Sequence, residues 1–143
     1  NPYLMKDMDK AVARIEKAIA NNENILVFGD YDVDGTTAVS LVSSYLRSFY
    51  PNVATYIPDR YAEGYGISYM GIDYAEDNDI SLIIALDCGI KSIDHVNYAK
   101  AKNIDFEFYI NLYEDKNSFE TVSKPFLIDY FEKLNFLEDL ENL

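Results

Sequence analysis

The sequence predicts an α/β fold, in which a parallel sheet of about four strands carries helices on both faces, followed by a helical, acidic tail. Short apolar runs alternate with longer segments whose apolar residues recur every three or four positions, which is typical of strands alternating with amphipathic helices. Of the 143 residues, 49% are hydrophobic, so the chain can bury a core despite a net charge of −13. The expected elements are a helix over 7–22, a strand over 25–28, a helix over 36–50, a strand over 53–57, a helix over 69–78, a strand over 81–86, a helix over 92–103 and a strand from 104.

The first four elements are predicted from apolar spacing and from the residues that interrupt it. Segment 7–22 places its aliphatic residues on one helical face, and two asparagines end the pattern. Residues 25–28 form an apolar run that is too short for a helix and stops at Gly29, which indicates a buried strand. The pattern over 36–50 is helical again, and it ends before a proline that leads into the next strand.

The second half of the chain repeats this alternation. A weak helix precedes an apolar run, and a further helix leads into the last strand. Strands that alternate with helices are joined by right-handed crossovers and therefore form a parallel sheet. Because ligands of such sheets bind beyond the carboxyl ends of the strands, we expect the functional residues in the loops 30–35, 58–66 and 87–91 and in the segment that follows the fourth strand.

The excess of acidic residues limits the partners that the chain can bind. The chain holds 25 aspartates and glutamates against 12 lysines and arginines, so DNA or an anionic membrane would be repelled unless metal ions supplied positive charge. The single cysteine, Cys88, excludes an internal disulfide and suits a reducing compartment. Because the first residues lack a signal-peptide pattern and no apolar run could cross a membrane, we expect a soluble, cytoplasmic protein.

Three aspartates follow the first predicted strand at alternate positions. Asp30, Asp32 and Asp34 precede Gly35 at the start of a helix. Carboxylates packed this closely repel one another unless a cation lies between them, and oxygen ligands suit Mg²⁺ or Mn²⁺. The alternative interpretation is a solvated acidic turn that caps the helix.

Two other motifs share part of this pattern. A calcium EF-hand loop that began at Asp30 would need a helix before it and a glutamate where this chain has Leu41, so the EF-hand is excluded. Asp32 and Asp34 also resemble the aspartate pair of haloacid-dehalogenase phosphatases, in which the first attacks phosphorus and the second acts as acid and base. That phosphatase chemistry is the alternative enzymatic hypothesis.

A fourth carboxylate is expected at the same edge of the sheet. Asp87 directly follows the apolar run 81–86, so two strands would deliver carboxylates to one point, as a metal site requires. On its own, an aspartate at this position could simply cap the next helix. Cys88 beside it is predicted to be a packing residue rather than a metal ligand.

The loop over 58–66 supplies a cation and exposed aromatic rings at this edge. The guanidinium of Arg60 could hold a phosphate with two hydrogen bonds, and Tyr61 and Tyr65 could stack on bases. A glycine-hinged surface loop with packing tyrosines is the alternative. His95, the only histidine, lies in a predicted helix, and we expect it to be solvated.

Three stretches closely resemble, in order and spacing, the amino-terminal part of the RecJ family of single-stranded-DNA-specific exonucleases, which belongs to the DHH phosphoesterase superfamily. They read GDYDVDGTTA over 29–38, PDRYAEGYGI over 58–67 and ALDCGI over 85–90. The likeness extends over about residues 1–106. Three ordered motifs make it specific.

The resemblance implies a parallel α/β domain that binds two Mn²⁺ or Mg²⁺ ions. Asp32, Asp34 and Asp87 match catalytic metal ligands of the family, and Asp30 is near enough to contribute directly or through another ligand. Some members of the family carry histidine at the position of Phe28.

The resemblance also implies a substrate-binding region. Arg60 and the turn Glu63, Gly64, Tyr65 and Gly66 match a region expected to face single-stranded DNA. The implied reaction is hydrolysis of phosphodiesters in the 5′-to-3′ direction by metal-activated water.

The last quarter of the chain, residues 107–143, departs from the family pattern. An Asp-His-His motif should follow the fourth strand, but residues 107–113 read Glu-Phe-Tyr-Ile-Asn-Leu-Tyr. Residues 107–143 hold nine acidic residues, three lysines and eight aromatic residues, and a last helix is expected to begin at Lys124-Pro125. We therefore expect an incomplete domain over 1–106 and a divergent tail over 107–143, as in a truncated or recombined chain.

Two functional hypotheses follow. The first is a metal-dependent exonuclease or a short phosphoesterase relative that uses Asp32, Asp34, Asp87 and Arg60. The second is a non-catalytic folded remnant or interaction module that binds one metal ion or none. Because the Asp-His-His motif is missing, little nuclease activity is expected from the chain.

Overall fold

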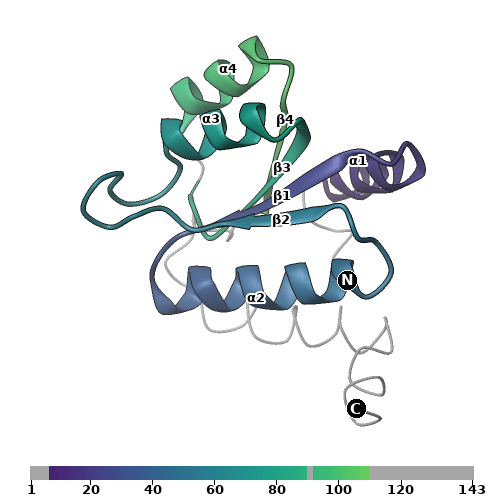
Figure 1. The fold of residues 1–143 in the computed structure, drawn as a ribbon, viewed down its shortest axis with the longest axis horizontal. Coiled ribbons are helices and arrows are strands. Elements are labelled where there is room, and N and C mark those ends of the chain that lie inside the picture. The colour runs from purple at the N-terminus through teal and green to yellow at the C-terminus, as the bar shows by residue number, and fades with distance from the viewer. Residues whose placement is uncertain (1–6, 90–91, 110–143) are drawn as a thin grey trace, which may run out of the picture. The chain divides into compact units, whose positions relative to one another are not determined.

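Four strands form one parallel sheet in the computed structural model, which describes residues 7–89 and 92–109. The strands β1 (Asn24–Gly29), β2 (Val53–Tyr56), β3 (Ile80–Leu86) and β4 (Asp105–Tyr109) lie in the order β2-β1-β3-β4. The helices α1 (Met8–Ala20), α2 (Val33–Arg47), α3 (Tyr69–Asp77) and α4 (Ile93–Ala101) alternate with them along the chain (Figure 1). The predicted α/β fold is confirmed.

Residues 12–110 form one compact unit, which contains the whole sheet. The helix expected at Lys124-Pro125 and the acidic tail lie outside the described residues. The last described strand, β4, continues past Phe106 to Tyr109.

The order of the strands creates a point where the winding of the chain reverses. From β1 the chain crosses to β2 on one side, and the next strand, β3, pairs with β1 on its other side. Parallel pairing aligns the carboxyl ends of β1 and β3, with Gly29 opposite Leu86. Ligands of open parallel sheets bind at such a reversal, so the residues that follow these two strands occupy the expected position for a site.

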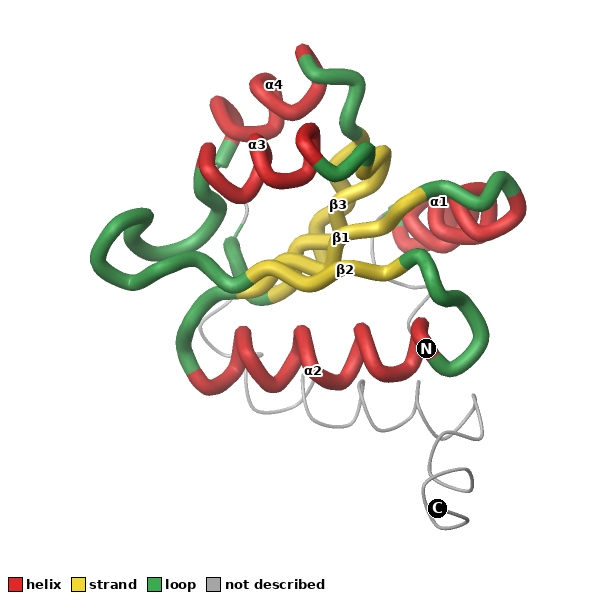
Figure 2. Tube along the Cα trace, viewed as in Figure 1, coloured by secondary structure: helices red, strands yellow, loops and turns green. Residues whose placement is uncertain are grey.

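Helices cover both faces of the sheet, as predicted (Figure 2). Alternate residues of the strands point to opposite faces, so each strand contributes to two apolar layers. The layer shared with α2 and the end of α1 consists of Ala18, Ile25, Val27, Val39, Leu46, Tyr50, Val53, Leu82, Ile84 and Leu86. The layer shared with α3 and α4 consists of Leu26, Phe28, Ile67, Ile72, Ala75, Ile80, Ile83, Ala85, Ala99 and Ile104. Burial on both faces explains why the central strands are continuous apolar runs.

Helix α2 begins at Val33, three residues before the predicted start at Thr36. Asp32 is its N-cap, with extended backbone, and its carboxylate accepts a hydrogen bond from the Gly35 amide at 2.9 Å. Aspartate satisfies the free amides of the first turn well, so it caps the helix in preference to the later threonine. The glycine inside this turn is required by space, because a Cβ at Gly35 would lie 2.5 Å from the backbone oxygen of Asp30.

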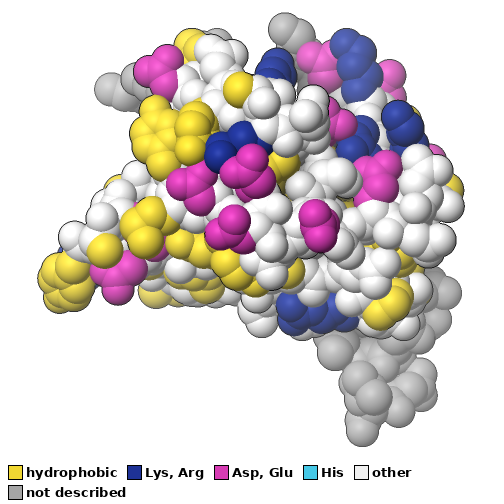
Figure 3. All heavy atoms as spheres, turned by 45° about the horizontal axis from the view of Figure 1, so that its top comes forward, with side chains coloured by type: hydrophobic (Ala, Val, Ile, Leu, Met, Phe, Trp, Pro, Cys, Tyr) yellow, Lys and Arg dark blue, Asp and Glu magenta, His cyan; other side chains and the backbone are white. Residues whose placement is uncertain are grey.

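The surface over α3 and α4 carries acidic side chains with basic ones among them (Figure 3). Lys102, just after α4, pairs with two acids of α3, Asp73 at 3.2 Å and Glu76. These pairs offset part of the negative charge and join the two helices. Within 7–89 and 92–109, no helix has the length and apolar character needed to cross a membrane.

Candidate metal centre

Strand β1 delivers Asp30 to the reversal point in a completely buried position. Its Oδ1 accepts a long hydrogen bond of 3.3 Å from the Gly66 amide. Its Oδ2 is buried and has no hydrogen-bond partner. A buried carboxylate oxygen without a partner is costly, and a bound cation is a common way to satisfy it.

Asp32 lies at the same edge, closer to the surface, and each of its two carboxylate oxygens accepts one hydrogen bond. Its Oδ1 accepts from the Gly35 amide, and its Oδ2 accepts from the Tyr65 hydroxyl at 2.9 Å. The hydrogen bond to Asp32, together with burial and the nearby Asp30, raises the pKa of the Tyr65 phenol well above its usual value. Tyr65 therefore stays protonated and acts as a donor to Asp32 at neutral pH.

Strand β3 ends in the turn that holds Asp87 and Cys88. The backbone of Asp87 is left-handed, with φ of 56°, a conformation that aspartate tolerates better than most residues. Burial, followed by the charges of Asp30, Asp87 and Asp32, raises the pKa of the Cys88 thiol to about 12. The raised pKa keeps the thiol protonated at neutral pH, which suits packing better than metal ligation.

Asp30, Asp32 and Asp87 follow the carboxyl ends of β1 and β3 and lie at one edge of the sheet. Asp34 lies two residues beyond Asp32, in the first turn of α2, with its side chain exposed. Among the described residues, no three histidine, cysteine or acidic side chains converge closely enough to hold one metal ion. The donor set nevertheless suits a hard divalent cation, since it consists of carboxylate oxygens of which one is buried and unpartnered.

The segment between β2 and α3, residues 57–68, extends beyond this edge (Figure 1). The guanidinium of Arg60 lies over the ring of Tyr31 at 5.5 Å, and that ring meets Tyr65 edge-on at 5.6 Å. Tyr61 is 94% exposed, so its ring is available for stacking. Tyr31 was not predicted as a site residue; its only signal in the sequence is its place between two aspartates.

Glu63 holds the segment 57–68 together rather than facing outward. Its Oε1 accepts from the Asp59 amide at 2.7 Å, and its Oε2 accepts from the hydroxyls of Tyr56, at 2.9 Å, and Ser68. Ser68 in turn caps α3 through the Gly71 amide. Gly64 and Gly66 have positive φ angles of 85° and 87°, which let the chain turn back toward Asp30.

His95 is not the solvated side chain that we expected. It is half-buried, and its ring packs against Tyr69 with 4.2 Å between the ring centroids. Helices α3 and α4 bring these residues together, although they are far apart in the sequence. The side chain is therefore part of an aromatic contact between two helices.

Comparison with known proteins gives consistent matches to this part of the chain. Residues 24–108 match the DHH family, N-terminal domain. The chain is 38% identical over 105 residues to the single-stranded-DNA-specific exonuclease RecJ of Bacillus subtilis, and 33% identical over 101 residues to that of Escherichia coli. These matches cover 73% and 70% of this chain but only 13% and 18% of the two relatives.

Solved structures agree with the sequence comparison. A crystal structure of exonuclease RecJ bound to manganese superposes with a TM-score of 0.66 and 27% identity, covering 73% of this chain and 27% of that one. RecJ of Thermus thermophilus in complex with Mn²⁺ gives a TM-score of 0.60 and, at 22% identity, supports the fold alone. This agreement decides against the haloacid-dehalogenase alternative, and the chain belongs to the DHH family, whose N-terminal domain it shares over residues 24–108.

Proposed function

We propose that this chain binds a divalent cation, Mn²⁺ or Mg²⁺, at the reversal point of its sheet and presents it to single-stranded DNA. The buried, unpartnered Oδ2 of Asp30 is the observation that carries the proposal, because it marks a place where a positive charge is missing. Asp32 and Asp87 supply the neighbouring carboxylates. A bound ion of this kind stabilises negative charge on a phosphodiester and lowers the pKa of a coordinated water.

Asp30 and Asp32, which both bond to the turn at Tyr65 and Gly66, would hold the ion, and Asp87 and Asp34 would have to move closer to join them. Together these side chains explain why so acidic a chain can approach DNA. Its net charge of −13 repels phosphates, and the ion offsets that charge where the strand would bind.

The segment 57–68 would contact the DNA strand itself. Arg60 is exposed beside the carboxylates and can bind a phosphate through two hydrogen bonds. Tyr61 and Tyr65 are exposed and can stack on bases without regard to sequence. Gly64 and Gly66 keep this segment close to Asp30, and Glu63 maintains its shape.

We further propose that hydrolysis by this chain is slow. The RecJ pattern supplies additional ligands from an Asp-His-His motif after the fourth strand, and the residues that follow Phe106 do not contain it. The only histidine, His95, is occupied in a ring contact with Tyr69. The proposal therefore assigns this chain one ion and weak DNA binding rather than rapid turnover.

Calorimetric titration with Mn²⁺ tests the metal site. Asp32→Asn is the most informative variant, because asparagine keeps the helix cap while removing the charge. We expect saturable binding by the wild-type chain and a loss of at least about tenfold in affinity for the variant. Asp77→Asn, an exposed change at the end of α3, is the matched control and should bind as the wild type does. Absence of binding at millimolar Mn²⁺ would overturn the proposal.

A nuclease assay tests the second part of the proposal. The chain is incubated with 5′-labelled single-stranded DNA and Mn²⁺, beside Asp32→Asn. We expect little nucleotide release from either protein. Rapid release by the wild type that the substitution abolishes would refute slow hydrolysis while supporting the metal site.

A further inference from the structure

The segment 57–68 is fixed at its base by a single carboxylate. Glu63 accepts hydrogen bonds from the Asp59 amide at 2.7 Å, from Tyr56 of β2 at 2.9 Å and from Ser68, which caps α3. Both ends of the segment and the preceding strand are therefore joined through one side chain. These contacts set the direction in which the segment leaves the sheet. They do not by themselves position Tyr65 and Gly66, which we call the tip of the segment.

The tip of the segment contacts the carboxylates at the reversal point. The Tyr65 hydroxyl donates to Asp32 Oδ2 at 2.9 Å, and the Gly66 amide donates to Asp30 Oδ1 at 3.3 Å. The Tyr65 side chain is 64% exposed, so apolar burial does not explain its position. The hydrogen bond to Asp32 and the edge contact with Tyr31 hold it in place.

These contacts fix the orientation of the Asp32 carboxylate. The Gly35 amide holds Oδ1 and the Tyr65 hydroxyl holds Oδ2, so rotation of the carboxylate would break at least one hydrogen bond. Each oxygen keeps a second lone pair that can face an ion. Metal-ligating carboxylates are commonly held by such partners, and loss of a partner typically weakens metal binding about 10- to 100-fold.

We propose that Tyr65 is a positioning residue for Asp32, and that it couples binding of a divalent cation to ordering of the segment 57–68. This inference rests on the proposed metal site. An ion bound by Asp30 and Asp32 would fix the acceptors of both tip hydrogen bonds. The same segment carries Arg60 and Tyr61, so the ion would order the groups that face the DNA.

Tyr65→Phe tests the inference, because it removes one hydroxyl and leaves the ring. Tyr69→Phe is the matched control, since it makes the same change at an exposed tyrosine of α3, outside the segment 57–68. In calorimetric titrations with Mn²⁺, we expect the Kd of Tyr65→Phe to rise about 10- to 100-fold and that of Tyr69→Phe to be unchanged. Circular dichroism checks that both variants are folded.

Hydrogen exchange provides the second readout. On addition of Mn²⁺, the amides of Gly64 and Gly66 should become more protected in the wild type and in Tyr69→Phe, and much less so in Tyr65→Phe. Equal Mn²⁺ affinity of Tyr65→Phe and wild type, or exchange that ignores Mn²⁺ in the wild type, would overturn the inference and leave the metal site standing. A wild-type chain that binds no Mn²⁺ would overturn both.

Discussion

At the scale of single residues, the close approach of Asp30, after β1, and Gly35, in α2, sets two requirements. Asp30 must be accommodated in a completely buried position, and Gly35 must stay small because a Cβ there would lie 2.5 Å from the Asp30 backbone oxygen. Both requirements come from the tight return of the chain into α2. A side chain on Gly35 or a missing charge on Asp30 therefore has a measurable effect.

Gly35→Ala should lower the free energy of unfolding by about 2–4 kcal/mol. The added methyl group would lie 2.5 Å from the Asp30 oxygen and 2.7 Å from its nitrogen, so the backbone must move. Chemical denaturation measures the loss. Ser40→Ala, an exposed change on the same helix, is the control and should stay within about 0.5 kcal/mol of wild type. A Gly35→Ala protein as stable as the control would contradict the close approach.

Asp30→Asn should have effects of opposite sign with and without metal. In EDTA, we expect stabilisation of about 1 kcal/mol, because a neutral amide replaces a buried charge with an unpartnered oxygen. With Mn²⁺ present, the wild type should gain stability and the variant should not. Thermal melts in both conditions, with Asp77→Asn as the control, measure the difference. Destabilisation of Asp30→Asn in EDTA would show that the charge is already satisfied.

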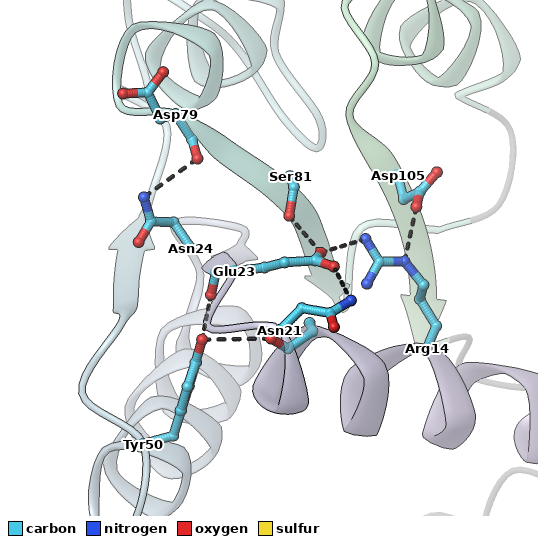
Figure 4. Close-up of polar contacts among 9 residues, drawn as sticks. Arg14, Asn21, Glu23, Asn24, Tyr50, Asp79, Ser81 and Asp105 are labelled. Atoms are coloured by element: carbon cyan, nitrogen blue, oxygen red, sulfur yellow. Dashed lines mark hydrogen bonds and ion pairs between the residues drawn. The ribbon is translucent and has the colours of Figure 1, made fainter.

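At the scale of elements, a polar network joins α1 to the amino ends of β3 and β4 (Figure 4). Glu23 accepts from Ser81 of β3 at 2.6 Å and from Arg14 of α1 at 2.8 Å. Arg14 also donates to Asp105 of β4 at 2.7 Å. The Glu23 side chain is only 20% exposed, so these contacts are partly shielded from solvent.

The contribution of Glu23 to stability should depend on pH. The hydrogen bond from Ser81, followed by the contact with Arg14, lowers the pKa of Glu23 from 4.5 to about 2. Because the folded-state pKa is depressed, the stabilisation is complete above pH 4.5 and disappears as the pH falls through about 2.

Glu23→Gln should therefore cost about 2 kcal/mol at neutral pH and much less near pH 2. Denaturation midpoints of wild type and variant, measured across this range, should converge at low pH. Glu16→Gln, an exposed change on α1, is the control and should run parallel to wild type. A gap between Glu23→Gln and wild type that is independent of pH would exclude a charge effect.

At the scale of the whole molecule, the net charge of −13 should make stability depend on salt. Self-repulsion destabilises a folded chain with excess charge, and salt screens it. Raising NaCl from about 0.05 M to about 0.5 M at neutral pH should raise the melting temperature by a few degrees. Near the sequence pI of about 4.3 the shift should largely vanish. A shift of equal size at both pH values would point to a cause other than net charge.

Local patterns in the sequence were enough to predict the alternation of elements, the parallel sheet and the aspartates that follow its strands. These features depend on local periodicity and on the general geometry of crossovers, which each stretch of chain expresses alone. The sequence-based prediction misplaced the start of α2, because Asp32 and Thr36 are both acceptable caps and packing at Gly35 favours the earlier one. It likewise took His95 to be solvated, since the ring of Tyr69 reaches it only through the packing of α3 on α4.

The contacts that the site residues make depend on packing between distant parts of the chain. Tyr65 and Asp32 are 33 positions apart, and Ser81 and Glu23 are 58 apart, so no local pattern relates them. The structure also buries Asp30 and leaves Asp34 exposed in the first turn of α2, although both aspartates stand in one short motif. Burial and hydrogen bonding are properties of the packed chain. They leave one carboxylate oxygen of Asp30 without a partner and let Tyr65 orient the carboxylate of Asp32.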